Sequence, residues 1–382
     1  MAAPSEYSAI LSGEARPVDV VAIEGELRQL WTAAAQDVFE GHPVVRACVL
    51  SLVAYAPGDG VARHISEVLA QVSGRHPSRS IVIVAESGTG APLLQAAISA
   101  HCQIAPEGGK QVCSEQITLR ASGPAVGELH STVVSLLVPD LPVFLWWHEE
   151  PSLESHLFQE LLETSDRLVV DSADFAPESA ASSLAALQRL AREGTVAVSD
   201  LNWSRLNHWR ELVAQFFDTP PARQHLDRLK SVNVEVAPVR GSEPGFIEGL
   251  LLVGWLASRL GWTLEKGGKR ARDGALAFDL RSAVGSVHVE LKPVPGRPRG
   301  GLLSVLLGAA GGVSFSISRD AKDYACVVVA AGMRDGGGPP RAVRMDLPSE
   351  AALLCEELEM LADDSVYREA LDEAVRFMEV GR

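Results

Sequence analysis

The densest group of side chains that could do chemistry lies in the segment Asp200–Arg210, DLNWSRLNHWR. On a helix, Trp203 shares one face with Arg210. Arg205 shares another face with Trp209. Tryptophan and arginine are enriched at the energetic centres of interfaces, because they desolvate a large area and keep directional contacts. The segment therefore indicates a partner-binding surface, with burial inside the domain as the alternative for the two tryptophans.

Two aspartates could line a ligand crevice near this segment. Asp171 closes one predicted strand and Asp200 closes the next. Binding crevices of parallel α/β sheets lie at the carboxyl ends of the strands, so these carboxylates and the nearby arginines could hold a phosphorylated ligand. The alternative is that both aspartates cap the helices that follow them.

Three further segments invite a phosphate-binding interpretation. Glu86–Gly90 (ESGTG) follows a predicted strand, but it fits neither the Gly-x-x-x-x-Gly-Lys-Ser/Thr pattern nor Gly-x-Gly-x-x-Gly, so a tight turn is expected. Lys266–Arg272 (KGGKRAR) and Gly296–Gly300 (GRPRG) are two basic loops in an acidic chain, and they could hold a phosphate or face an acidic partner. Solvated turns are the alternative for both.

Metal and nucleophile chemistry is not indicated. The histidines are spread along the chain without a His-Glu-x-x-His spacing or a comparable ligand pattern. The cysteines form no Cys-x-x-Cys motif, so we expect reduced, mostly buried thiols and neither a disulfide framework nor a zinc site. The sequence therefore predicts no catalytic set, no metal and no cofactor. The cysteines are Cys48, Cys102, Cys113, Cys326 and Cys355.

Composition excludes two classes of partner. The chain has 382 residues, of which 47% are hydrophobic and 22% charged, as in an ordinary folded protein. Its formal net charge of -15 disfavours nucleic acid, because binders of nucleic acid present a basic surface. No apolar run is long enough to span a bilayer, and the first residues lack the pattern of a signal peptide, so a cytoplasmic protein is expected.

Hydrophobic periodicity predicts two domains. Residues 1–220 alternate apolar strands with amphipathic helices, which is typical of an α/β domain with a largely parallel sheet. Prolines at 220 and 221 interrupt the pattern and mark the boundary. Residues 221–382 contain consecutive strands with short turns, which predict an α+β domain with an antiparallel meander and two terminal helices. The elements expected in the first domain include strands at Arg46–Tyr55, Ser80–Glu86, Gln111–Ala121, Pro142–Trp147, Arg167–Asp171 and Val196–Asp200, and a helix at Trp203–Asp218.

Five blocks, in order along the chain, resemble the OpcA family of glucose-6-phosphate dehydrogenase assembly proteins. Words such as LPVFLWW and LNWSRL are too particular to arise from generic strand or helix composition. The resemblance covers about the middle half of the chain. The blocks are HPSR (His76–Arg79), CSEQITL (Cys113–Leu119), PDLPVFLWW (Pro139–Trp147), DLNWSRLNHWRELVAQFFD (Asp200–Asp218) and GWLASRLGW (Gly254–Trp262).

The resemblance implies a bacterial, non-catalytic protein of the oxidative pentose phosphate pathway. Such a protein promotes the active oligomer of glucose-6-phosphate dehydrogenase and so acts as its allosteric activator. In cyanobacteria the family is tied to thioredoxin control, but the only close cysteines here are Cys102 and Cys113, and redox regulation is not predicted. The residues expected to form a partner surface or ligand crevice are Arg79, Glu115, Trp147, Asp171, Asp200, Trp203, Arg205, Trp209, Arg210 and Arg259.

Two other functions stay open from the sequence. The chain could be a sugar-phosphate-binding sensor or an uncharacterised enzyme, with its crevice at the strand ends of the first domain. It could also be a permanent structural subunit of the dehydrogenase rather than a regulator. A pocket with converging arginines would favour the first of these, and an association that resists salt would favour the second.

Overall fold

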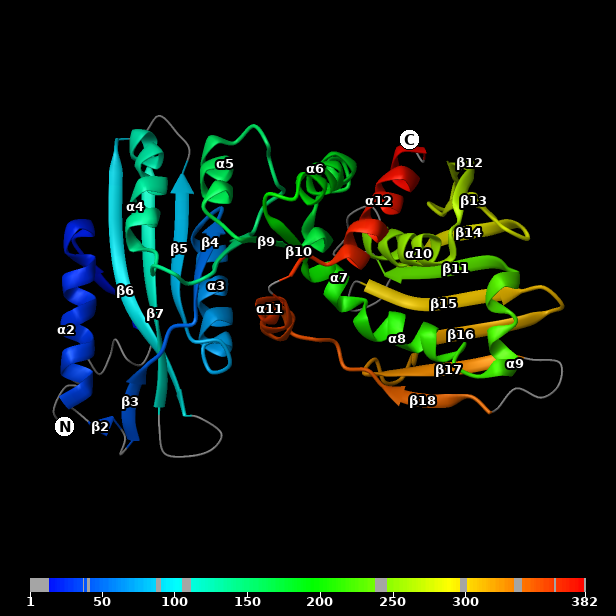
Figure 1. Ribbon diagram of the computed structural model, residues 1–382, viewed down its shortest axis with the longest axis horizontal. Helices are drawn as coiled ribbons and strands as arrows, with labels where there is room; N and C mark the ends of the chain where they lie inside the picture. The colour runs from blue at the N-terminus through cyan, green and yellow to red at the C-terminus, as the bar shows by residue number, and fades with distance from the viewer. Residues whose placement is uncertain are drawn as a thin grey trace. The chain divides into compact units, whose positions relative to one another are not determined.

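The computed structural model divides into two compact units (Figure 1). Each unit is made of three separate segments, so the chain crosses between them several times and no single residue divides them. The domain boundary near residue 220 therefore stays a prediction. The structure describes residues 14–36, 38–39, 42–86, 91–104, 111–237, 246–295, 301–332, 339–360 and 362–380. The first unit comprises Met1–Val170, Glu193–Ser199 and Ser349–Asp363, and the second comprises Asp171–Arg192, Asp200–Pro348 and Asp364–Arg382.

The first unit is built on a mixed sheet in the order β1-β6-β7-β5-β4-β8-β9-β10. From β7 to β10 this is the strand order of a doubly wound nucleotide-binding fold, with β4 at the centre and parallel to both β5 and β8. The largely parallel α/β architecture is therefore confirmed. The strands are β1 (Arg16–Val18), β2 (Val38–Phe39), β3 (His42–Arg46), β4 (Leu50–Ala56), β5 (Ser78–Glu86), β6 (Leu93–Ile104), β7 (Gln111–Ser122), β8 (Val143–Trp147), β9 (Arg167–Val170) and β10 (Ala197–Asp200).

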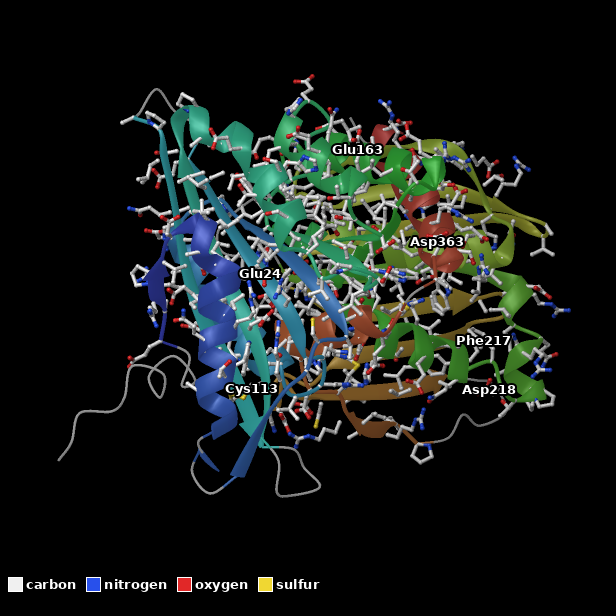
Figure 2. The ribbon with its side chains drawn as sticks, turned by 60° about the vertical axis from the view of Figure 1, so that its left-hand side comes forward. Glu24, Cys113, Glu163, Phe217, Asp218 and Asp363 are labelled. Atoms are coloured by element: carbon white, nitrogen blue, oxygen red, sulfur yellow. A yellow bond between two sulfur atoms is a disulfide. The ribbon has the colours of Figure 1, made fainter. Side chains whose placement is uncertain are left out.

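Strand β6 was not predicted, and it corrects the expectation about the cysteines. Its sequence, LLQAAISAHCQI, has only two β-branched residues, yet it pairs antiparallel with β7 along its whole length. This pairing places Cys102 directly opposite Cys113, and the two form a disulfide (Figure 2 labels Cys113). The expectation that all five thiols are reduced was wrong for this pair. Cys102 and Cys113 are 11 residues apart and form no recognisable sequence motif. They meet because the register of β6 and β7 places them opposite each other.

Amphipathic helices of the first unit bury one face each, several of them against this sheet. In α3, for example, Ala62, Ile65, Leu69 and Val72 are buried at helical spacing while Arg63 is exposed. No helix in the described ranges of either unit is long and apolar enough to cross a membrane. The helices of the first unit are α2 (Ile23–Gln36), α3 (Asp59–Val72), α4 (Leu129–Leu136), α5 (His156–Glu163) and α11 (Glu350–Glu359).

The second unit contains an eight-stranded sheet in the order β12-β13-β14-β11-β15-β16-β17-β18. Neighbours pair antiparallel except β11 and β14, so the expected meander is confirmed as two runs, β12–β14 and β15–β18, on either side of β11. The strands are β11 (Leu229–Ala237), β12 (Thr263–Arg270), β13 (Leu276–Ser282), β14 (Gly285–Pro293), β15 (Gly301–Ala309), β16 (Val313–Arg319), β17 (Cys326–Gly332) and β18 (Arg341–Arg344).

The basic segment Lys266–Arg272 was expected to be a loop, but most of it belongs to β12. This strand lies at the edge of the sheet, where charged residues discourage pairing with another chain. Its register with β13 is irregular, which explains why no clear alternation marked it as a strand. The other basic segment, Gly296–Gly300, lies outside the described residues, as do residues 87–90 of the ESGTG turn.

The helices of the second unit include two that pack closely. A Cβ on Gly254 of α10 would lie 2.3 Å from the carbonyl oxygen of Ala370 in α12, so only glycine permits this approach. The helix expected over Trp203–Asp218 is instead two helices, because the backbone turns at Leu206. The helices are α6 (Ala180–Glu193), α7 (Leu201–Arg205), α8 (Asn207–Gln215), α9 (Pro220–Arg223), α10 (Ile247–Leu260) and α12 (Ser365–Val380).

Candidate functional site

Asp171 and Arg205 form a bidentate ion pair in the second unit. Arg205 Nη1 donates to Asp171 Oδ1 at 2.6 Å, and Nη2 donates to Oδ2. Asp171 Oδ1 also accepts from the backbone N–H of Ala173, at 3.1 Å, and so caps the turn that follows β9. Burial would lower the pKa of the Arg205 guanidinium, but the hydrogen bonds and charge of Asp171 outweigh that effect and raise it. The pair is therefore charged, and each partner neutralises the other.

Asp200 is fully buried and acts as a cap. Its Oδ1 accepts from the backbone N–H groups of Asn202 and Ser172, at 2.9 and 3.0 Å, and Tyr367 Oη donates to Oδ2 at 3.3 Å. Burial, followed by the nearby charge of Asp171, raises the pKa of Asp200 to about 6. The capping alternative therefore accounts for Asp171 and Asp200, which both hold the ends of strands to the turns after them.

Trp203 lies beneath Arg210, as the helical spacing indicated. The Arg210 guanidinium carbon lies 3.6 Å from the indole centroid, in a cation–π arrangement. Trp203 Nε1 donates to Asp364 Oδ2 at 2.9 Å, and Asp364 caps α12 by accepting from the backbone N–H of Tyr367. The indole is only 3% exposed, so it packs inside the second unit.

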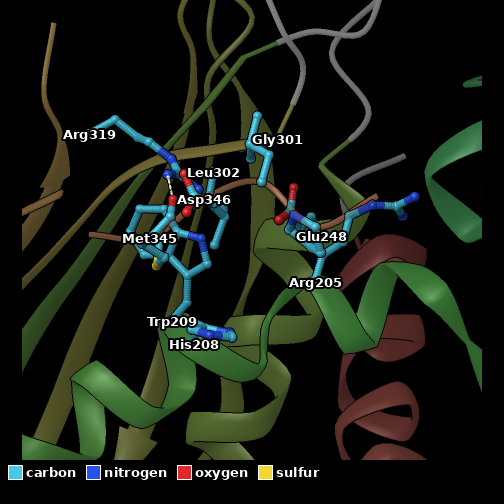
Figure 3. A pocket seen from close by; sticks show the side chains of 11 residues that line it. Arg205, His208, Trp209, Glu248, Gly301, Leu302, Arg319, Met345 and Asp346 are labelled. Carbon is cyan, nitrogen blue, oxygen red and sulfur yellow. Dashed lines mark hydrogen bonds between the residues drawn. The ribbon is translucent and has the colours of Figure 1, made fainter. Parts of the chain in front are cut away.

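Arg205 and Trp209, expected on one helical face, both line a cavity of about 240 Å³ in the second unit (Figure 3). Sequence reasoning missed three charged residues of this cavity, namely Glu248 at the start of α10, Arg319 at the end of β16, and Asp346. Glu248 and Arg319 belong to no recognisable motif, because they are 71 residues apart and meet only where α10 packs against the sheet. The remaining lining residues are His208, Gly301, Leu302, Met345, Leu347 and Pro348.

Glu248 is buried, and its carboxylate accepts a hydrogen bond from the backbone N–H of Leu302. Burial raises the pKa of Glu248 to about 7, although the charges of Arg205 and Arg319 oppose the shift. Burial lowers the pKa of Arg319, whose Nη1 donates to the carbonyl oxygens of Tyr324 and Met345, at 3.0 and 2.6 Å.

Arg79 and Glu115 belong to the first unit and join at the amino ends of β5 and β7. Arg79 Nε donates to Glu115 Oε1, and Arg79 Nη1 donates to Glu24 of α2, at 2.5 Å (Figure 2 labels Glu24). Trp31 Nε1, also from α2, donates to Glu115 Oε2 at 2.8 Å. These hydrogen bonds attach α2 to the sheet, on the side away from the carboxyl ends of the strands.

Trp147 ends β8 and stacks on Tyr55 of β4, with ring centroids 3.9 Å apart. The strand order changes direction between β4 and β8, so this is the position where doubly wound folds bind a dinucleotide. The turn after β4 keeps Gly58 and Gly60 of a Gly-x-Gly-x-x-Gly pattern but has Arg63 at the third position. The third glycine permits close packing of helix on strand, and the stacked rings are buried, with Tyr55 9% and Trp147 3% exposed. These residues do not fit a dinucleotide.

Arg259 is the most exposed of the candidate arginines. It lies on α10 and forms an ion pair with Glu369 of α12, with side chains 40% and 48% exposed. The ten candidates therefore form no single site. In the first unit, the joined pair Arg79 and Glu115 lies away from Trp147, which is at the carboxyl end of β8. The other seven candidates belong to the second unit. Among the described residues, no group of His, Cys, Asp and Glu side chains is placed to hold a metal ion.

Two family profiles match the sequence. The profile of the glucose-6-phosphate dehydrogenase subunit N-terminal domain (OpcA) matches residues 70–191, and that of the C-terminal domain of the same subunit matches residues 196–371. A Synechococcus elongatus protein named for OpcA and the OxPP cycle is 30% identical over 319 residues, which are 78% of this chain and 67% of the relative. A Synechocystis protein with the same name is 34% identical over 196 residues, 50% of this chain. The matched part is 39% of that relative's length.

Among solved structures, the transcriptional regulator Gal80p from Kluyveromyces lactis has a similar fold. Its TM-score is 0.50 at 10% sequence identity, and the match covers 90% of this chain and 94% of that chain. At this identity the likeness concerns the fold alone: a Rossmann-like sheet followed by a mostly antiparallel sheet.

Proposed function

This chain belongs to the OpcA family of glucose-6-phosphate dehydrogenase subunits, and on that premise we propose that it is a non-catalytic assembly factor and allosteric activator of the dehydrogenase. The observation that carries the proposal is the match of both domain profiles, one after the other, along residues 70–191 and 196–371. Its place is then the oxidative pentose phosphate pathway of the bacterium.

The structure supports a binding role in two ways. The acidic residues expected to act at a crevice, Asp171 and Asp200, are engaged in capping and in an ion pair. At the dinucleotide position of the Rossmann-like sheet, Tyr55 and Trp147 stack on each other and are buried. The turn after β4 also lacks the third glycine of the dinucleotide pattern.

Activation would follow from differential affinity. A protein that binds the active oligomer of the dehydrogenase more tightly than the inactive form shifts the population by that difference and by no more. A coupling of about 1–3 kcal/mol changes an apparent substrate affinity roughly 5- to 150-fold. Arg259, the most accessible candidate, is proposed as one contact with the partner.

The test is the glucose 6-phosphate saturation curve of the same organism's dehydrogenase, measured with and without an excess of this protein, together with size exclusion of the mixture. We expect a lower half-saturation and elution as a larger complex. Unchanged kinetics with separate elution would refute the proposal. Co-elution that persists in high salt without any kinetic change would instead identify a permanent structural subunit.

One observation favours a ligand-binding role as a second candidate, namely the cavity beside Arg205. A sugar-phosphate sensor or an uncharacterised enzyme was expected to use the strand ends of the first domain. The cavity instead lies within the second unit, and its second arginine is Arg319.

A further inference from the structure

The cavity beside Arg205 contains a carboxylate, Glu248, that has unoccupied hydrogen-bond acceptor positions. Glu248 is 8% exposed and forms no ion pair with a residue in the described part of the chain. An ionised carboxylate offers about four acceptor positions, and Leu302 N–H occupies one of them. A buried carboxylate without a paired cation is costly unless donors reach it. The open acceptor positions of Glu248 therefore call for hydrogen-bond donors.

Arg319 supplies a donor on the same cavity wall. Its Nη1 is held by the carbonyl oxygens of Tyr324 and Met345, which fixes the guanidinium in place. Its Nε is buried and has no hydrogen-bond partner among the residues that the structure describes. Because buried donors are nearly always paired, this N–H is suited to donate to a ligand oxygen.

The rest of the lining sets the size and charge of an occupant. Arg205 is neutralised by Asp171, and in Figure 3 its guanidinium lies on the opposite side of Glu248 from Arg319. Trp209 also lines the cavity, but it is 2% exposed and the Arg319 guanidinium carbon lies 5.6 Å from its ring centroid. The volume of about 240 Å³ is below the ~300–1,000 Å³ of sites for drug-sized ligands, so the occupant is small.

We propose that this cavity binds a polyhydroxylated ligand of the size of one sugar ring, whose hydroxyls donate to Glu248 and whose oxygen accepts from Arg319 Nε. The hydroxyls of a sugar ring both donate and accept, so they suit a wall that presents the carboxylates of Glu248 and Asp346 and the unpartnered Nε–H of Arg319.

Titration calorimetry of the full chain with D-glucose, glucose 6-phosphate and inorganic phosphate tests the proposal. At least one of the two sugars should bind, and Glu248→Gln should weaken that binding about tenfold or more, since hydrogen bonds to a charged group are lost. Glu290→Gln, on β14 and outside the cavity lining, is the matched control and should bind as the unaltered chain does.

A second variant keeps the test decisive if Glu248→Gln folds poorly. Arg319→Lys retains the charge but lacks the Nε donor, and it should also weaken sugar binding. The proposal is overturned if neither sugar binds up to about 10 mM, a weaker affinity than almost any specific site. It is equally overturned if phosphate alone binds as well as the sugar phosphate, or if both variants bind as the control does. None of these outcomes involves the dehydrogenase, so the proposed partnership is judged separately.

Discussion

Tyr55 and Trp147 stack face to face, with ring centroids 3.9 Å apart, at the carboxyl ends of two neighbouring parallel strands. The indole also packs edge-on against Phe158 of α5, at 4.9 Å. Tyr55 and Trp147 are 9% and 3% exposed. A fold that elsewhere opens a crevice at this point is therefore closed here by the side chains of its own strands.

We expect from this stack that the full chain does not bind NAD⁺ or NADP⁺. The third glycine of the dinucleotide pattern lets the helix pack closely on the strand, and Arg63 replaces it in the turn after β4. Titration calorimetry with each dinucleotide, with a dehydrogenase as positive control, checks this. A dissociation constant below about 100 μM, which is ordinary for such cofactor sites, would contradict it.

Gly254→Ala should destabilise the second unit strongly. The added methyl group would overlap the carbonyl of Ala370, so α10 and α12 would have to separate. We expect a loss of about 1–3 kcal/mol or more in the free energy of unfolding, measured by urea denaturation. Gly60→Ala, where a Cβ meets open space, is the control and should be neutral or slightly stabilising. Equal behaviour of the two variants would show that the helices do not approach this closely.

Glu248 should make stability fall as pH rises. Its pKa is about 7 in the folded chain against 4.5 for the ordinary group, so the folded state binds the proton more tightly. The stability from this proton is complete below about pH 4.5 and is lost through about pH 7, by on the order of 3 kcal/mol. Glu248→Gln removes the effect. It should be the more stable chain at pH 8, with no such advantage at pH 4.5.

Urea denaturation of both chains at pH 4.5, 6 and 8 measures this difference. Asp200, with a pKa of about 6, titrates in both chains, so its contribution cancels in the comparison. The charges that act on Glu248, namely Arg205, Arg319 and Asp171, are also unchanged. Parallel stability curves for the two chains would mean that Glu248 titrates normally.

Arg259→Glu should weaken association with the dehydrogenase if Arg259 contacts the partner. The variant also breaks the ion pair with Glu369, so the double variant Arg259→Glu, Glu369→Arg serves as control, because it restores a pair of opposite charges within the chain. We expect both variants to lose affinity about 5-fold or more, as for a charge at the rim of an interface. Recovery of binding in the double variant would assign Arg259 to internal stability instead.

Loss of the disulfide should cost about 2–3 kcal/mol, the loop-closure contribution of a bond spanning 11 residues. The Cys102→Ser, Cys113→Ser chain and the reduced parent chain should unfold at the same lower urea concentration. Cys326→Ser, which removes a free thiol, should leave the midpoint unchanged. A parent chain indifferent to reductant would mean that β6 and β7 alone hold this register.

Local patterns in the sequence were enough to predict the order of the secondary structure. Apolar strands alternating with amphipathic helices predicted the Rossmann-like sheet, and consecutive strands within residues 221–382 predicted the antiparallel one, because periods of 2 or 3.6 residues can be recognised among neighbouring residues. Distinctive sequence motifs such as LPVFLWW indicated the family. Arg205 and Trp209, expected on one face of a single helix, lie on two helices and still line one cavity.

Which distant residues meet depends on how the elements pack. Glu248 and Arg319 line one cavity because α10 packs against the sheet that contains β16, and Cys102 lies opposite Cys113 because of the register of β6 and β7. No local period predicts either contact. Burial also decided between alternatives that the sequence left open, since Trp203 could equally have faced a partner. The periodicity of a segment determines on which face of its helix or strand a side chain lies. The packing of whole elements determines which residues that face contacts.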